Sequence, residues 1–263
     1  MTSPKKPESH YIYPGYGRPL QPREGGSSAQ IKERVARVAR VLAKGGILPW
    51  VFGHCSARIQ GCDVVYMMCH VHWEGKLIQE VTADDIHMVR MSGETIDCDS
   101  IDVPEERFFH LEVYKARPDI GGLVYGHPNM SPVFASAKRD TLTLWGEKVP
   151  LMDWPGFGSG AEKGQLVAKN MGKANAVVWE SGDVVVGKTI EEACINAFAL
   201  EWEAQRQIFL AILGVKDPKP ANFFPTVDDK AYFASKVGFE WFEGMDPGPR
   251  KEVDGRLFWT AGL

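Results

Sequence analysis

The chain has 263 residues, of which 44% are hydrophobic and 24% charged, and its formal net charge is -4. This length and composition suffice to bury a substantial core in one large domain, and the mild acidity with interspersed basic residues argues against nucleic-acid binding. There is no apolar run of 18 residues and no signal-peptide core, so we expect a cytoplasmic protein without a membrane partner. The five cysteines show no pairing pattern, which predicts reduced thiols.

The first half of the chain predicts an arm, a helix and a strand-rich middle. Residues 1–28 are rich in proline and tyrosine and predict an extended arm. Apolar residues at helical spacing, between a serine N-cap and a glycine stop, then predict a helix at about 30–44. Apolar stretches predict three strands, in "HCSARI", "DVVYMMC" and "DIHMVRMSGETI", the last with a hairpin turn at "SGE".

The second half alternates helices with strands. "PEERFFHLEVYKARPD" has proline and acids at its start and stops before Pro118, which predicts a helix leading into the strand "IGGLVYGHP". Next come a helix in "GSGAEKGQLVAKNMG", the strands "NAVVWES" and "DVVVGK", and a long helix in "TIEEACINAFALEWEAQRQIFLAILG". This order predicts an α/β domain with a mixed sheet over residues 29–214. Residues 215–263 are rich in proline and aromatics and predict an extension that packs on another surface.

Several stretches in register resemble the class II aldolase and adducin family. They are "FGHCSARI", "VPEERFFHLEVYKARPDIGGLVYGHPNMSPVFA" and "VVWESGDVVVGKTIEEA". The family pattern has a G-N-x-S turn, an S-x-E-x-x-x-H helix start, an R-P-D turn, an H-T-H strand end and an N-H-G-x-x-x-x-G-x-x-x-x-E-A stretch. The resemblance spans about residues 30–213. It implies one α/β/α domain with a central mixed, largely antiparallel sheet, and a homotetramer whose sites lie between subunits.

The resemblance also implies a divalent metal, usually zinc, held by three histidines, while a glutamate moves protons. The three ligand positions here hold Tyr125, His127 and Ser181, so two of the three histidines are absent. Glu106, four residues before His110, occupies the glutamate position. The predicted catalytic residues are therefore Glu106 for proton transfer, His127 for metal or oxyanion binding, and Tyr125 as a hydrogen-bond donor. The ordinary alternative is that each of these residues is structural.

Histidines elsewhere in the chain offer a rebuilt site. His54 stands where the family has the asparagine of its anion-binding turn, and His70 and His72 lie near its second anion-binding loop. Alternate residues of a strand point to one face, which is the spacing that a chelate needs. One expectation is an iron, zinc or manganese ion held by His127, His54 and either His70 or His72, with Glu106 as the carboxylate. The other is a site without metal.

The substrate expected from the sequence is small, unphosphorylated and acidic. The family's phosphate-binding positions read "GHCS", "MMCH" and "VPE", which provide few donors for a phosphate. The predicted substrate-binding residues are His54, Ser56, His72 and Ser181. Aromatic residues in the predicted loops suggest an aromatic hydroxy- or oxo-acid, although any one of them is more often a core residue: Trp73, Trp145, Trp154, Phe157 and Trp179.

Three functions from different classes remain open. The first is a carbon–carbon lyase, either an aldolase or a decarboxylase. The second is a non-haem iron oxygenase of the kind described in aminocoumarin antibiotic pathways. The third is a non-catalytic, adducin-like interaction module. Retention of Glu106 and His127, together with the added histidines, favours an enzyme and above all a lyase.

Overall fold

The computed structural model describes residues 27–59, 61–71, 75–98, 103–156, 160–216, 250–253 and 256–259, the last two ranges as backbone only. Almost all of the predicted arm at 1–28 and most of the predicted extension at 215–263 lie outside these residues. Both predictions therefore stay predictions. Where the chain is described, no helix is both long enough and apolar enough to cross a bilayer.

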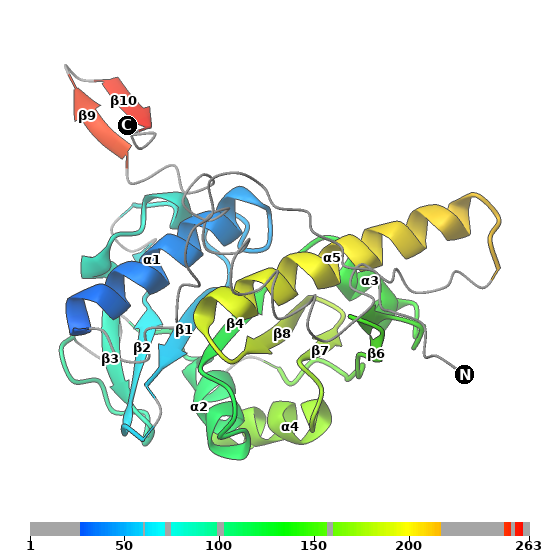
Figure 1. The fold of residues 1–263 in the computed structure, drawn as a ribbon, viewed down its shortest axis with the longest axis horizontal. Coiled ribbons are helices and arrows are strands. Elements are labelled where there is room, and N and C mark those ends of the chain that lie inside the picture. Colours follow the sequence, from blue (N-terminus) through cyan, green and yellow to red (C-terminus); the bar gives the residue numbers. More distant parts are fainter. Residues whose placement is uncertain are drawn as a thin grey trace, which may run out of the picture.

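The helices and strands predicted from the sequence are present (Figure 1). The helices are α1 (Ser28–Lys44), α2 (Arg107–Ala116), α3 (Ser131–Ser136), α4 (Ala161–Met171) and α5 (Ile190–Ile212), with 3-10 turns η2 (Ile78–Glu80) and η3 (Ala83–Asp85). The strands are β1 (His54–Arg58), β2 (Val64–Met68), β3 (Ile86–Arg90), β4 (Gly122–Gly126), β5 (Thr143–Leu144), β6 (Glu147–Lys148), β7 (Ala176–Trp179), β8 (Gly182–Gly187), β9 (Arg250–Val253) and β10 (Arg256–Trp259). Helix α3 and the hairpin β5–β6 were not predicted, because such short elements carry no periodic pattern.

The central sheet has six strands in the order β3-β2-β1-β4-β8-β7. Each of its five ladders is antiparallel. One isolated bridge to the sheet, between Leu151 and Val178, is parallel. The predicted mixed, largely antiparallel sheet is confirmed.

Helices cover both faces of this sheet and complete an α/β/α sandwich (Figure 1). One buried cluster joins α1 and α5 to one face, and a second joins α2 and α4 to the other. On β4, Val124 belongs to the first cluster, whereas its neighbours Leu123 and Tyr125 belong to the second. This alternation follows from the two-residue period of a strand and directs Tyr125 toward α2.

The long helix α5 lies very close to the sheet because two strands present glycine to it. A Cβ atom on Gly122 would lie 2.3 Å from Ile190 Cα, and one on Gly187 would lie 2.4 Å from the Ala193 nitrogen. Neither distance is sterically possible, so glycine at these positions sets how closely the helix and sheet pack.

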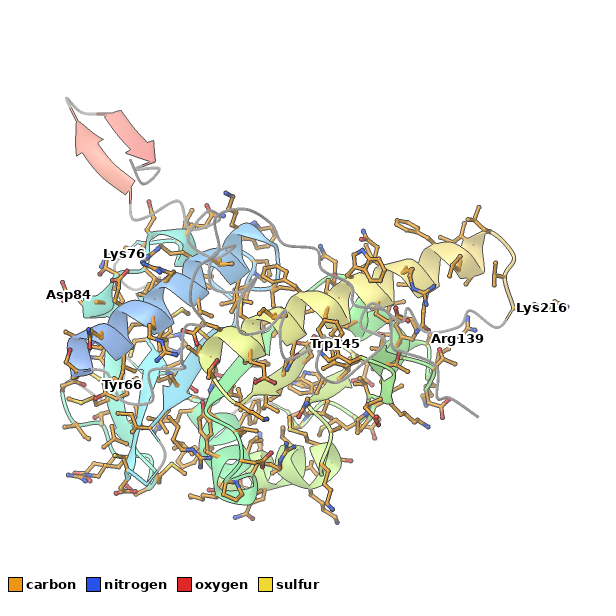
Figure 2. The ribbon with its side chains drawn as sticks, viewed as in Figure 1. Tyr66, Lys76, Asp84, Arg139, Trp145 and Lys216 are labelled. Atoms are coloured by element: carbon orange, nitrogen blue, oxygen red, sulfur yellow. The ribbon has the colours of Figure 1, made fainter. Side chains whose placement is uncertain are left out.

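Of the tryptophans considered as substrate contacts, Trp179 lies in the hydrophobic core and Trp145 packs against that core. Trp145 is labelled in Figure 2, and its Nε1 donates a hydrogen bond to Asn196 Oδ1 on α5 at 2.7 Å. Trp179 has no exposed surface and packs against Phe109 and Tyr125. Trp179 thus takes the core position that is the more frequent one for a tryptophan, whereas Trp145 is half-buried and Trp154 is 39% exposed. Residues 73 and 157 lie outside the described part of the chain.

Candidate active site

One stripe of helix α2 carries three chemically active side chains toward the sheet. Glu106, His110 and Tyr114 follow one another at intervals of four residues, which places them on one helical face. Glu106 occupies the N-cap position and is half-buried, while His110 and Tyr114 have no exposed surface. The helix therefore points one carboxylate, one imidazole and one phenol at the same side of the sheet.

Strands β1 and β4 supply the facing side chains. His54 on β1 pairs directly with Tyr125 on β4, and their ring centroids are 5.0 Å apart. His127 follows the end of β4, and its ring centroid lies 4.7 Å from that of Tyr125. We call His54, Tyr125, His127 and Glu106 the Tyr125 cluster.

A chain of buried hydrogen bonds links this cluster to α2. His54 Nδ1 lies 2.8 Å from His110 Nε2, and His110 Nδ1 lies 2.7 Å from Ser56 Oγ. Ser56 Oγ also lies 3.0 Å from the Tyr114 hydroxyl, which donates to the Ser56 carbonyl oxygen at 3.0 Å. Burial lowers the pKa of His110 to about 3. Burial also lowers the pKa of His54 well below its ordinary value, and the neighbouring imidazoles lower it further. Both rings are therefore neutral at pH 7.

The hydrogens available to these neutral groups allow one arrangement that satisfies all four contacts. A carbonyl oxygen only accepts, so the Tyr114 hydroxyl donates to the Ser56 backbone. The Ser56 hydroxyl then donates to Tyr114, His110 Nδ1–H donates to Ser56, and His54 Nδ1–H donates to His110. The remaining nitrogen, His54 Nε2, carries a lone pair, and among the residues that the structure describes it is buried without a hydrogen-bond partner. Such an atom calls for a bound group as its partner.

His127 also has an unprotonated Nε2, and a single hydrogen bond decides this. Its Nδ1 lies 2.7 Å from the backbone carbonyl oxygen of Ser181, which only accepts, so Nδ1 carries the proton. Burial lowers the pKa of His127, against the opposing effects of the Ser181 carbonyl and Glu106. The ring is therefore neutral at pH 7, and its Nε2 is a second unprotonated acceptor beside Tyr125.

Tyr125 is the donor of the cluster. Burial raises its pKa, and the carboxylates of Glu106 and Asp183 raise it further. The hydroxyl therefore keeps its proton at neutral pH and can donate to an oxygen that gains negative charge. The Glu106 carboxylate raises the pKa of both Tyr125 and His127 and is therefore within electrostatic range of the two groups.

The two predicted serines differ in what they present. Ser56 has no exposed surface, and its hydroxyl pairs with His110 and Tyr114. In this structure it belongs to the hydrogen-bond chain behind His54, in place of the predicted substrate contact. Ser181 is exposed, and its backbone carbonyl orients His127. A substrate contact by its hydroxyl stays a prediction.

The predicted departure from the family's three-histidine site stays a prediction. At the three ligand positions, His127 provides the one imidazole, since Tyr125 and Ser181 hold the others. His70 lies close enough to His54 for its charge to lower the pKa of His54, and residue 72 is outside the described ranges. Among the residues that the structure describes, no three ligand atoms of the Tyr125 cluster and His70 lie within 4.8 Å of one another. The rebuilt metal centre is thus not assembled here and stays a prediction.

Several residues of the site were missed by the sequence interpretation. Asp183 on β8 is almost fully buried. Burial raises the pKa of its carboxyl to about 7, although a hydrogen bond from Ser131 acts to lower that pKa. The Glu201 carboxylate accepts hydrogen bonds from the backbone nitrogens of residues 129, 130 and 131 and so holds the loop after His127. Asp183 lies in the quoted stretch "VVWESGDVVVGK", but nothing in the sequence indicates its burial. His110 and Tyr114 could have been found from the sequence, because each follows the previous residue of the helical stripe from Glu106 by four positions.

These side chains combine three chemical capacities. Glu106 can transfer a proton, Tyr125 can stabilise a negative oxygen, and the two bare imidazole nitrogens can accept hydrogen bonds or hold a cation. Neutral imidazoles without a proton at Nε2 do not attract a carboxylate. In the assigned tautomer His54 Nε2 accepts a hydrogen bond and does not donate one, and the predicted substrate contact of His54 stays a prediction.

Comparisons with known proteins relate this chain to decarboxylases and to an adducin. A 3,4-dihydroxyphthalate decarboxylase from Arthrobacter keyseri is 32% identical over 104 residues, which is 38% of this chain and 41% of that protein. Mouse alpha-adducin is 28% identical over 153 residues, covering 54% of this chain and 20% of the adducin. The match thus spans less than half of each of these two relatives. A 3,4-dihydroxyphthalate decarboxylase from Terrabacter sp. strain DBF63 is 27% identical over 206 residues, covering 72% and 84% of the two chains.

The fold is shared with solved aldolase structures. The L-fuculose 1-phosphate aldolase from Glaciozyma antarctica PI12 superposes with a TM-score of 0.65 at 19% identity, covering 86% of this chain and 93% of that one. The model of the "Class II Aldolase and Adducin N-terminal domain" matches residues 33–208. The chain therefore belongs to the class II aldolase and adducin family.

Proposed function

We propose that this chain is a lyase that decarboxylates a hydroxylated, unphosphorylated aromatic carboxylic acid. The observation that carries the proposal is the Tyr125 cluster, in which the rings of His54 and His127 pack against a protonated phenol within electrostatic range of the Glu106 carboxylate. The decarboxylase relatives support the reaction type at the level of the family. The substrate and the roles of individual residues are inferred from the chemistry of the cluster.

The two bare nitrogens favour a substrate with two hydroxyl donors. The rings of His54 and His127 both lie against the ring of Tyr125, and the Nε2 atom of each can accept one hydroxyl hydrogen. A 3,4-dihydroxyphthalate has two adjacent hydroxyls, and one of them neighbours a carboxylate. Such a compound can therefore donate one hydroxyl hydrogen to each of the two bare nitrogens.

The proposed reaction follows from this placement. His127 Nε2 accepts the hydrogen of the hydroxyl next to the reacting carboxylate, and Tyr125 donates to the same oxygen as negative charge develops there. Glu106, in its carboxyl form, adds its proton to the ring carbon that bears the carboxylate. The bond from that carbon to the carboxylate then breaks, its electron pair restores the aromatic ring, and CO2 leaves. The phenolate oxygen that is restored with the ring takes its proton back from His127, and the Glu106 carboxylate regains a proton from solvent.

The family's divalent metal, when bound, polarises a carbonyl or enediolate oxygen. The described residues at its position supply too few ligand atoms to hold it as the family does, so the reaction is written through the protein side chains. We expect His127→Ala to abolish decarboxylation while leaving the zinc content of the purified protein unchanged. Loss of zinc together with activity would instead support a metal held by His127.

The test of the proposal is direct. The purified chain is incubated with 3,4-dihydroxyphthalate and with single-hydroxyl analogues, while CO2 release and oxygen uptake are measured together. We expect one CO2 for each substrate consumed, no oxygen uptake, and slower turnover when either hydroxyl is missing. Oxygen uptake in step with product would support the oxygenase alternative. A folded protein that releases no CO2 from any hydroxylated aromatic acid would overturn the decarboxylase proposal and leave the aldolase and the adducin-like module.

A further inference from the structure

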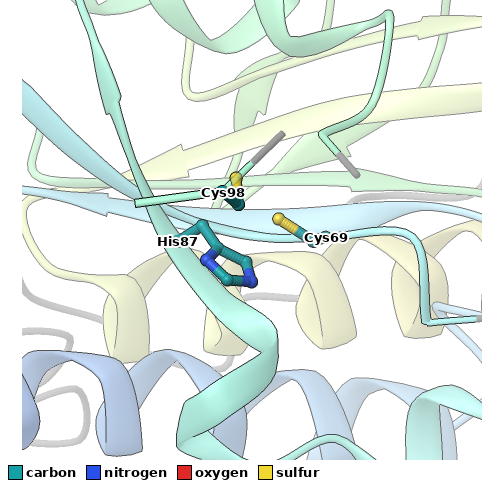
Figure 3. A group of neighbouring side chains, drawn as sticks. All are labelled: Cys69, His87 and Cys98. Carbon is teal, nitrogen blue, oxygen red and sulfur yellow. The ribbon is translucent and has the colours of Figure 1, made fainter. Parts of the chain in front are cut away.

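Three metal-ligating side chains meet at the β3 edge of the sheet, away from the family's ligand positions. They are Cys69, His87 and Cys98, and one ligand atom from each lies within 4.8 Å of the other two (Figure 3). Cys69 is buried, and the other two are half-buried. None of the three has a role in the proposed reaction.

The fold brings these residues together from both sides of strand β3. Met67 on β2 pairs with His87, and Cys69, two residues beyond Met67, lies on the same face. On the other side of β3, the Ile96 nitrogen donates to the Met88 carbonyl at 2.9 Å, and this pairing brings Cys98 alongside. The Cys69 nitrogen also donates to the Asp85 carbonyl at 3.1 Å, which fixes the end of β2 against β3. The convergence is therefore set by backbone pairing.

We propose that Cys69, His87 and Cys98 bind a divalent cation of the zinc class. Two sulfur ligands and one imidazole form a soft donor set, which favours Zn²⁺ over Mg²⁺ or Ca²⁺, since those ions prefer oxygen. Each thiol loses its proton to solvent as it becomes a thiolate ligand. No oxidation or reduction takes place.

Asp97 stands behind His87 in the position of a supporting carboxylate. Its Oδ1 lies 3.4 Å from His87 Nδ1, a buried nitrogen that has no hydrogen bond in the described structure. The carboxylate is itself held by the Met88 backbone nitrogen and by Lys32 Nζ, each at 2.7 Å. A carboxylate that engages one imidazole nitrogen leaves the other for the metal and strengthens it as a ligand.

The location gives this cation a structural role. Cys69 directly precedes His70, whose charge acts on His54 in the Tyr125 cluster. A cation at Cys69 would hold the backbone next to His70 against β3. It would thus stabilise the edge of the candidate active site without entering the reaction, and the inference does not depend on the proposed decarboxylation.

Cobalt binding tests this site, because thiolate–cobalt charge-transfer absorption arises from sulfur ligands and not from the imidazoles around Tyr125. The full chain is stripped of metal, reduced and titrated with Co²⁺ alone. We expect a charge-transfer band that saturates at one cation per chain. It should vanish in Cys69→Ser and Cys98→Ser and persist in the control Cys62→Ser, since Cys62 is exposed and outside the cluster. Asp97→Asn should weaken binding by about 10- to 100-fold.

A second measurement covers variants that fail to fold. In the wild-type chain, Zn²⁺ should protect Cys69 and Cys98 from alkylation, as read by mass spectrometry, and leave Cys62 reactive. A wild-type protein without the cobalt band, or one whose Cys69 and Cys98 react equally with and without Zn²⁺, would overturn the proposal.

Discussion

His54 Nδ1 on strand β1 lies 2.8 Å from His110 Nε2 on helix α2, and this contact decides which nitrogen of His54 faces the candidate active site. His54 Nδ1–H donates to His110 Nε2, because the hydrogen bonds of Ser56 and Tyr114 place the His110 proton on Nδ1. His54 is left with an unprotonated Nε2. A residue buried in the helix layer thus sets the hydrogen-bonding character of a residue in the site.

Glu106→Gln is expected to lower turnover by about a hundred- to ten-thousandfold, because an amide cannot transfer a proton. The fold and assembly should be unchanged, as judged by circular dichroism and sedimentation. Glu105→Gln is the matched control, since Glu105 is the adjacent exposed carboxylate. Equal rates for the two variants and the wild type would show that Glu106 is a helix-start residue without a catalytic role.

Tyr114→Phe is expected to reverse the tautomers of His110 and His54. Without the Tyr114 hydroxyl, the Ser56 hydroxyl finds its partner in His110 Nδ1, which moves the His110 proton to Nε2 and the His54 proton to its own Nε2. Nitrogen NMR of the histidine side chains reports this change directly. The Michaelis constant should rise, because His54 would then donate where it now accepts. The lost buried hydrogen bond should destabilise the fold by about 1–3 kcal/mol.

Tyr66→Phe is the control for that experiment, because Tyr66 lies on the opposite face of the sheet with α1 and α5. Its histidine spectrum should match that of the wild type. An unchanged spectrum in Tyr114→Phe itself would refute the assigned hydrogen-bond order.

Gly182→Ala is expected to reduce activity through the position of His127. A Cβ atom at residue 182 would lie 2.5 Å from the Gly126 carbonyl oxygen and 3.2 Å from His127 Nδ1, so the strand end carrying His127 must move. Ser181→Ala should retain activity, because the Ser181 backbone carbonyl holds His127 and the side chain is exposed. Steady-state rates of the two variants check both statements. If Ser181→Ala is the more damaging change, the Ser181 hydroxyl contacts substrate after all.

Asp183 should make folding stability depend on pH. Its pKa is raised by burial to about 7, so the folded state holds a proton that the unfolded chain releases near pH 4. The stability from this protonated carboxyl is complete below about pH 4 and is lost as the pH rises through about 7. Relative to wild type, Asp183→Asn should therefore gain stability between pH 4 and 8, on the order of a few kcal/mol. Urea unfolding across this range tests it, and parallel curves would contradict it.

The homotetramer expected from the family is tested by sedimentation. The exposed ring of Phe52 has its centroid 6.1 Å from that of His127, and Trp50 nearby is 75% exposed, so apolar surface borders the candidate active site. A neighbouring subunit would cover such surface. We expect a species of about four chains, each of 29.2 kDa. A single 29.2 kDa species at working concentration would exclude this assembly.

The sequence alone determined the order of elements, the fold class and the family. Apolar periodicity located α1, α2, α4, α5 and the strands of the sheet, since these elements are long enough to show it. The resemblance to the family predicted site roles for Glu106 and His127, and these roles stay predictions. Local patterns carry this information because each of these residues lies within, or next to, one periodic element.

Tertiary structure alone decided the chemistry of those residues. The tautomers of His54 and His127 depend on Ser56, Tyr114 and the Ser181 carbonyl, which come from other elements. The raised pKa of Asp183 depends on burial, and the meeting of Cys69, His87 and Cys98 depends on strand register. Protonation, desolvation and metal chelation are properties of groups brought together across the chain, and a linear sequence does not state which groups those are.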